Sequence, residues 1–390
     1  MNITQLHTLV NTTTNEVLGV EDIVLNDLSN VVDVGKQIID SDKVDSYVKK
    51  LVNHIGKVVF VNRLYSGGVP SVMMDSWEYG SILEKITADM PTATENKSWD
   101  LNDGEDYSPN VFYKPSVSAK FFNSMVTFEI PMSFTEMQVK QSFSSAAQLN
   151  GFISMLQTSI ENAMTVKLDA LIMRTINHMI AETALTDITG DDDDIIDQTK
   201  STVRMVNLLS LYNAGKTPDN EVTAENAFYN AEFIRFATYQ IGLYSDRMAK
   251  ISTLFNVGAK ERFTPKDLQH IVLLSDFAKA SETFLLAESQ NADNVMLPKH
   301  ESVPYWQGSG KTYSFDDVSS VNVKTASNKD VLLTGIIGVI FDRDALGVTN
   351  LDRRVTTNYN PKAEFYNNFY KFDAGYYNDL NENFVVFFVG

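Results

Sequence analysis

The most regular pattern of hydrophobic and polar positions in the chain runs from Ser133 to about Leu185. Apolar residues recur there at spacings of three and four, which is typical of one face of a helix. Ser133 lies three residues before Glu136, the spacing of a capping box that begins a helix. No proline interrupts the pattern. The stretch predicts a single helix that is roughly 75 Å long at about 1.5 Å per residue.

A helix of this length has two interpretations. The apolar residues of a coiled coil follow a strict heptad, whereas those of this stretch do not. Gly151 also lies inside the stripe, where a glycine costs about 1 kcal/mol relative to alanine. We therefore expect a spine against which sheets and loops of the same chain pack, with a coiled coil as the alternative.

The residues before the spine predict a polar arm, two helices, a strand and a third, shorter helix. Residues 1–19 are rich in threonine and asparagine and show little periodicity, so we expect an arm that only partner molecules order. Helical spacing follows over residues 20–39 and 44–55. The β-branched and aromatic run Lys57–Tyr65 predicts a strand, and Met74–Ile86 predicts the short helix.

Residues Met90–Met132 carry no helical period and predict one long hairpin. Turn-forming residues gather near its middle, at Asn102–Asn110. On the returning arm the apolar positions change parity near Asn123 and Ser124, which indicates a bulge or a kink. Because a two-stranded ribbon is only marginally stable by itself in water, the hairpin must lie on another surface. We expect that surface to belong to a neighbouring subunit.

The residues after the spine predict an α/β region and a closing strand. Residues 186–340 contain helical spacing over residues 228–254 and a strand at His270–Leu274. The apolar run Val331–Phe341 predicts one buried strand, and Asn383–Val389 predicts the last strand of the chain. The fold class is therefore α+β. At 390 residues the chain exceeds the size at which one core stops growing, so we expect two or three subdomains.

Charge and composition exclude several classes of protein. The chain has 50 acidic and 32 basic side chains and a formal charge of -18, which repels phosphate and argues against sequence-independent wrapping of DNA or RNA. It has no cysteine, so disulfides, thiolate catalysis and cysteine-bound metals are excluded. No run of eighteen apolar residues occurs, and Met1–Asn11 lacks the features of a signal peptide. We expect neither secretion by a signal peptide nor a membrane span.

No motif in the chain predicts catalysis. Ser210–Thr217 contains Gly-Lys-Thr but has a serine in place of the first glycine of a P-loop, and Pro218 follows, so it is better interpreted as a turn. The carboxylates of Asp191–Asp194 are of the type that binds calcium or magnesium, although adjacent carboxylates in a loop seldom converge. The five histidines are scattered without a pair at ligand spacing. We expect no catalytic residue, cofactor or metal, with a metal-dependent enzyme using the Asp191–Asp194 loop as the alternative from another class.

Four separated segments carry a resemblance to a known family: Val69–Ile86, Asn110–Ala119, Phe128–Phe143 and Tyr376–Val389. With the order of the predicted elements, they make the chain resemble the major capsid proteins of tailed bacteriophages, which have the Hong Kong 97-like fold. The similarity is to those of small short-tailed phages of Gram-positive hosts. It implies a protein without catalytic activity that self-assembles into an icosahedral head shell around double-stranded DNA. The runner-up is a nonviral compartment shell of the encapsulin type, which shares the fold.

The resemblance also implies a division of the chain into named parts. These are an N-terminal arm with helices over residues 1–56, the start of a P-domain over 57–89, an extended E-loop hairpin over 90–132, the spine helix of the P-domain over 133–185, an inserted A-domain over 186–345, and the P-domain return with the closing strand over 346–390.

The partners implied by the resemblance are copies of the chain in hexamers and pentamers, a portal and other head proteins, with either a separate scaffold protein or none. The shell would enclose double-stranded DNA without sequence-specific binding and would contact no membrane. The implied location is the virion capsid, after assembly in the host cytoplasm. The candidate inter-subunit residues are aromatics of the expected E-loop, because large aromatic side chains often anchor interfaces. They are Trp99, Tyr107, Phe112, Tyr113 and Phe121.

Overall fold

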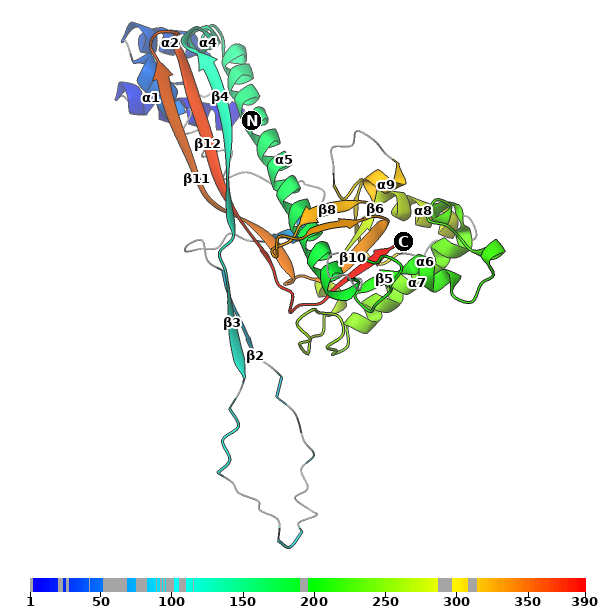
Figure 1. The fold of residues 1–390 in the computed structure, drawn as a ribbon. Helices are drawn as coiled ribbons and strands as arrows, with labels where there is room; N and C mark the ends of the chain where they lie inside the picture. Colours follow the sequence, from blue (N-terminus) through cyan, green and yellow to red (C-terminus); the bar gives the residue numbers. More distant parts are fainter. Residues whose placement is uncertain are drawn as a thin grey trace. The chain divides into compact units, whose positions relative to one another are not determined.

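The long helix expected from the hydrophobic pattern is confirmed in the computed structural model as α5, Ala146–Asp187 (Figure 1). Its 42 residues are about 63 Å long at about 1.5 Å per residue. The buried side chains keep the spacing of three and four, as Leu149, Ile153, Leu156 and Ile160 show. Gly151 lies on the exposed side, where an added Cβ would meet no atom within 4 Å. The apolar stripe is therefore covered by the chain's own residues.

The predicted start of this helix at Ser133 is wrong. Ser133 lies in the strand β4, Met125–Thr135, and its hydroxyl donates a hydrogen bond of 2.6 Å to the side chain of Asn367. The capping box is formed two residues later, by Thr135 and Gln138, and begins the short helix α4, Glu136–Ser142. Residues 143–145 separate α4 from α5. Exposed and more buried residues alternate along β4 as far as the buried Phe134. The strand therefore includes Ser133, the first of the two residues that could begin a capping box.

The structure describes residues 3–19, 24–25, 28–41, 43–51, 69–74, 83–88, 90–91, 93, 95, 102–104, 110–114, 116–189, 196–286, 297–307 and 314–390. The chain divides into two units, each built from separate stretches of sequence. Unit 1 comprises Met1–Glu78, Met125–Arg174 and Val348–Gly375, and unit 2 comprises Tyr79–Ser124, Thr175–Gly347 and Tyr376–Gly390.

The sheet of unit 1 has the strand order β1-β11-β12-β4, of which β11, β12 and β4 are seen side by side in Figure 1. Its strands are β1 (Met73–Met74), β11 (Leu346–Asn360), β12 (Phe365–Asn378) and β4. β12 runs antiparallel to β4 from the pair Phe365 and Thr135 to the pair Gly375 and Met125. The end of the expected hairpin, Met125–Met132, therefore pairs with a strand of its own chain, and the expectation that these residues belong to a hairpin lying on a neighbouring subunit is wrong.

Helices at the N-terminus complete unit 1: α1 (Ile3–Leu18), α2 (Val31–Asp40) and a helical segment over residues 44–51. The expectation of an irregular arm is wrong for residues 3–18. Thr13 and Thr14 are buried on the same side of α1 as Leu9, and the Thr13 hydroxyl donates to the Leu9 carbonyl at 2.8 Å. A hydroxyl satisfied in this way lets Thr13 lie on the buried face of the helix. The helix expected over residues 20–39 begins only at Val31.

The sheet of unit 2 has the strand order β5-β13-β10-β6-β7. Its strands are β5 (Met205–Asn207), β13 (Phe384–Phe388), β10 (Ile336–Asp342), β6 (Gln269–Leu274) and β7 (Glu301–Val303). The strands expected at His270–Leu274 and Asn383–Val389 are confirmed as β6 and β13. The closing strand thus pairs with β10 and β5, strands from the segment that was expected to form a separate inserted domain.

The single buried strand expected over Val331–Phe341 is wrong, because a turn divides it into β9 (Asp330–Leu333) and β10. Gly335 lies in this turn with φ +73°, and a Cβ there would lie 1.9 Å from the carbonyl oxygen of Val389. Only glycine can combine this backbone conformation with this close approach. β9 pairs with β8, Val321–Lys324, in a separate two-stranded sheet.

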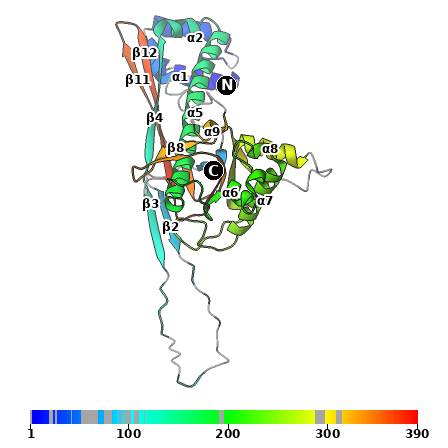
Figure 2. The ribbon, with the colours of Figure 1, turned by 45° about the vertical axis from the view of Figure 1, so that its right-hand side comes forward.

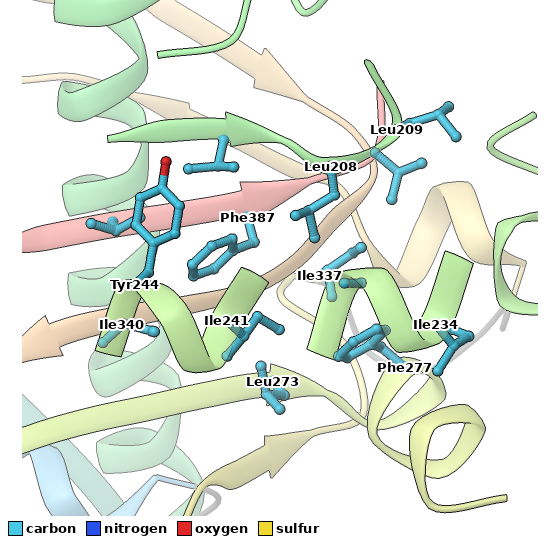
Figure 3. Packing of buried hydrophobic residues seen from close by; sticks show 14 of the residues in the cluster. Leu208, Leu209, Ile234, Ile241, Tyr244, Leu273, Phe277, Ile337, Ile340 and Phe387 are labelled. Carbon is cyan, nitrogen blue, oxygen red and sulfur yellow. The ribbon is translucent and has the colours of Figure 1, made fainter. Parts of the chain in front are cut away.

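Helices pack against the unit 2 sheet and bury its core. α7 (Ala231–Met248) and α8 (Ser275–Leu286) lie side by side (Figure 1, Figure 2). Tyr244 of α7 meets Phe387 of β13 edge-on, with ring centroids 5.4 Å apart (Figure 3). The remaining short helices of the described residues are α6 (Leu208–Asn213), α9 (Phe315–Val318) and the 3-10 turns Pro70–Val72, Pro218–Asn220, Ala227–Tyr229 and Lys266–Leu268.

Some expectations fall outside the described residues. They are the strand at Lys57–Tyr65, the acidic loop Asp191–Asp194, and Trp99 and Tyr107. In the part of the chain that the structure does describe, no helix combines the length and the apolar character that a membrane crossing needs.

Candidate functional site

The hairpin is formed by β2 (Leu83–Ala88) and β3 (Val117–Phe122), which lie side by side and antiparallel (Figure 1). The expected boundaries, Met90 and Met132, are therefore both too late in the sequence. The short helix expected over Met74–Ile86 is wrong at its C-terminal end, because Leu83, Lys85 and Thr87 alternate with exposed residues as in a strand; residues 75–82 lie outside the described residues. Spacings of three and four among neighbouring apolar residues suggested a helix, but the period of two decides the structure here.

The register gives the hairpin two distinct faces. Leu83 stands opposite Phe122, Lys85 opposite Lys120, and Ala88 opposite Val117. Directly opposite residues of an antiparallel pair share a face. The inner face consists of Leu83, Lys85, Thr87, Ser118, Lys120 and Phe122, and the outer face consists of Glu84, Ile86, Ala88, Val117, Ala119 and Phe121.

The inner face is attached by a ring contact to the end of β12 and by charges to the turn between β12 and β13. Phe122 packs on Tyr377 with ring centroids 5.0 Å apart. Lys85 Nζ donates to Asp379 Oδ2 at 2.9 Å and to Glu382 Oε1 at 2.8 Å. Lys120 Nζ donates to the other oxygen of Asp379, Oδ1, at 2.6 Å. These groups hold both strands of the hairpin to one turn of the same unit.

Arg262 completes this group, with its Nε 3.4 Å from Glu382 Oε1. We call Lys85, Lys120, Arg262, Asp379 and Glu382 the charge cluster. The side chain of Asp379 is only 1% exposed. A charge buried to this degree is stable only when it is paired and hydrogen-bonded, and here both carboxylate oxygens have a lysine partner.

The pKa values of the cluster follow from this pairing. Burial alone would raise the pKa of Asp379, but the hydrogen bonds from Lys120 and Lys85 outweigh it and hold the pKa below its usual range. Burial alone would lower the pKa of Lys85, but its bonds to Glu382 and Asp379 outweigh it and raise the pKa. The two groups are therefore charged together at neutral pH.

The outer face of the hairpin is apolar and exposed. Ile86 and Phe121 are each 64% exposed and Val117 is 58% exposed. Glu84 is the one charged residue of this face. Nearer the tip, Phe112 and Tyr113 are 84% and 85% exposed. Contiguous apolar surface of this kind marks a site of interaction with another molecule.

The structure describes some of the candidate inter-subunit residues but not all of them. Phe112, Tyr113 and Phe121 are exposed, and Phe121 shares the outer face with Ile86 and Val117, which were not among the candidate residues. In the sequence, the apolar Ile86 lies between the polar Lys85 and Thr87, and this alternation could have identified Ile86 as part of the outer face. Sequence reasoning also missed Asp379 and Glu382, for which no local pattern exists. Whether these aromatics contact another subunit stays a prediction.

Other candidate chemistry does not gather at one place in the described residues. Among these, no group of three or more histidine, aspartate or glutamate side chains is arranged to hold a metal ion. Of the segment Ser210–Thr217, residues up to Asn213 belong to α6, and the expected turn is found only after them, at Ala214 and Gly215, followed by the 3-10 turn Pro218–Asn220.

Comparison with known proteins places the chain in a family. The family description "Phi29-like phage major capsid protein" matches residues 10–388, so the chain belongs to this family of capsid proteins. It is accordingly a structural protein that associates with itself into the shell of a phage head and is located in the virion capsid. The match favours the phage shell over the nonviral compartment shell. No curated protein matches the chain.

Several solved structures are similar to the chain. A capsid structure of Staphylococcus phage Andhra is 11% identical, covers 84% of this chain and 86% of its own, and has a TM-score of 0.46. A chain of native bacteriophage P68 is 10% identical, with 85% and 86% covered and a TM-score of 0.48. A capsid structure of the cyanophage P-SCSP1u is 10% identical, with 85% and 92% covered and a TM-score of 0.43.

Proposed function

We propose that the chain builds an icosahedral head shell of a tailed phage by laying the outer face of its hairpin on a second copy of itself. The observation that carries this proposal is the two-faced hairpin. Its inner face is satisfied within the subunit by the charge cluster, whereas Ile86, Val117 and Phe121 have no such cover. In a shell built from one abundant chain, the surface most available to cover them is that of an identical neighbour.

In this proposal the named parts of a Hong Kong 97-like capsid protein apply with changed boundaries. The hairpin over residues 83–122 is the E-loop, and α5 is the spine helix of the P-domain. The A-domain includes the closing strand β13, because β13 lies inside the five-stranded sheet. Copies would associate in hexamers and pentamers and assemble in the host cytoplasm with a separate scaffold protein, a portal and other head proteins.

The enclosed molecule is double-stranded DNA, held without sequence-specific contacts and without catalysis by the shell. The formal charge of -18 supports weak contact, because a protein that binds phosphates tightly needs clustered lysine and arginine. Packaged DNA would therefore move freely against the inner surface of the shell.

The test replaces Phe121 by serine and measures particle formation by electron microscopy and density-gradient sedimentation. The matched control is Leu332→Ser, because Leu332 is a comparably exposed apolar residue on another two-stranded sheet of the same unit. We expect Phe121→Ser to keep the melting temperature of the subunit and to lose most particles, and Leu332→Ser to keep both. Normal particle yield from Phe121→Ser together with Ile86→Ser would overturn the proposal.

A further inference from the structure

The base of the hairpin contains a repulsion that the hairpin itself cannot relieve. Lys85 and Lys120 stand directly opposite each other on the inner face. Like charges in directly opposite positions of a strand pair are destabilising. The carboxylate of Asp379 lies between them, with one oxygen bonded to each lysine. Pairing of β2 with β3 at this point is therefore coupled to the presence of that carboxylate.

The position of Asp379 is fixed by the backbone of unit 2. Its amide donates to the carbonyl of Ala345 at 2.7 Å, and its Oδ1 accepts from the amide of Asn381 at 3.1 Å. The amide of Glu382 donates to the carbonyl of Asp379 at 3.1 Å, which closes the turn leading into β13. Since β13 is an inner strand of the five-stranded sheet, the charge cluster joins the hairpin to a rigid element.

We infer that Asp379 and Glu382 are positioning residues for shell assembly. They hold the base of the hairpin on unit 2 so that the outer face, with Ile86 and Phe121, is presented to a second copy. This inference rests on the proposed function, because it explains the orientation of the hairpin by the contact of its outer face with a second copy. It differs from a general stabilising role in one respect: Asp379 acts through the two lysines, and its loss matters only while both lysines are charged and opposed.

The test measures amide hydrogen exchange of free subunits and then their assembly into particles. In Asp379→Asn, residues 83–88 and 117–122 should exchange at least about tenfold faster, because the two directly opposed lysines lose the charged carboxylate between them. Residues 269–274 and 336–342, in the sheet, should exchange as in the wild type. The matched control is Asp246→Asn, which breaks an exposed ion pair of 2.5 Å with Lys266 in the same unit and should change neither exchange nor assembly.

A second variant separates positioning from a structural effect on the turn. Lys120→Met combined with Asp379→Asn removes the opposed charge and leaves Lys85 paired with Glu382. If Asp379 acts through the lysines, the double variant should recover most of the hairpin protection and particle yield that Asp379→Asn loses, as a coupled pair requires. Absence of any recovery in the double variant would overturn the inference.

The outcomes also separate this inference from the proposed function. Unchanged hairpin protection in Asp379→Asn would overturn the positioning role, whatever happens to the shell. Faster hydrogen exchange in the hairpin of Asp379→Asn together with normal assembly would also overturn the positioning role, because the orientation of the hairpin would then have no effect on assembly of the shell. If Phe121→Ser and Ile86→Ser both assemble normally while Asp379→Asn loses hairpin protection, the proposed docking of the outer face fails, although the attachment of the hairpin by the charge cluster stands.

Discussion

Lys85 and Lys120 face each other across β2 and β3, and a single buried carboxylate, Asp379, accepts a hydrogen bond from each. The two lysines come from the two arms of the hairpin, whereas Asp379 comes from the turn before the last strand of the chain. The arrangement fixes one face of the hairpin to its own subunit. It also determines that the opposite face, which carries Ile86 and Phe121, points away from this attachment.

The first prediction concerns acid and alkali. The pKa of Asp379 is lowered in the folded subunit, so its contribution to stability is present above about pH 4 and is lost as the pH falls through the lowered pKa. The pKa of Lys85 is raised, so its contribution is present below about pH 10.4 and is lost as the pH rises through the raised pKa. Asp379 is paired with Lys85 and Lys120. Glu382 is also bonded to Arg262, and the other titratable neighbour is Tyr377, which interacts with Asp379, Glu382, Asp342 and Asp344.

The measurement for this prediction is the free energy of unfolding in urea, for the wild type and for Asp379→Asn. The difference between them should be largest near neutral pH and should shrink toward about pH 3, because the wild-type carboxylate is then losing its charge. A difference that stays constant over this range would show that the charge of Asp379 does not stabilise the subunit.

The second prediction concerns the spine. Leu156 is buried in the apolar stripe of α5, so truncation to alanine should cost about 2–5 kcal/mol of the free energy of unfolding. The neighbouring Met155 is exposed, and Met155→Ala should change stability by less than about 0.5 kcal/mol. Urea denaturation of the two variants provides the comparison. Equal stabilities would mean that the apolar stripe of α5 is not covered within the subunit.

The third prediction concerns two glycines with positive φ. Gly215 has φ +84° in open space, so Gly215→Ala should cost about 1–2 kcal/mol, the strain of a left-handed residue. Gly335 has φ +73° and lies against the Val389 carbonyl, so Gly335→Ala should cost clearly more, since the strands around it must also shift. Thermal unfolding distinguishes the two. Similar losses for both would mean that the close approach at Gly335 is relieved without cost.

Elements with a strong local period could be predicted from the sequence. The spine, β6 and β13 have patterns in which neighbouring residues alone decide the structure. The start of the helical region was misplaced because two capping signals overlap, Ser133 with Glu136 and Thr135 with Gln138, and only the partner strand β12 decides between them. The helix α1 was missed because its inner side uses threonines, which are polar in any pattern of hydrophobic residues.

The candidate site was predictable only in part. A hairpin with exposed aromatics follows from the absence of helical period and from the turn residues near its middle, and Phe112, Tyr113 and Phe121 are indeed exposed. The base of the hairpin is set by contacts between residues far apart in sequence. Lys85 and Asp379 are separated by 294 positions, and neither lies in a motif. Such a pair is found only when the strands are placed in space.

The docking of the outer face on a second copy can be tested at Ala119. The chain contains no cysteine, so Ala119→Cys introduces a unique thiol on the exposed outer face with little change in size. Leu332→Cys, on another two-stranded sheet, provides the control. The measurement is the rate of maleimide labelling in free subunits and in assembled shells. We predict rapid labelling of Ala119→Cys in free subunits, strong protection in shells, and equal rates for Leu332→Cys; equal rates for Ala119→Cys in the two states would contradict the account.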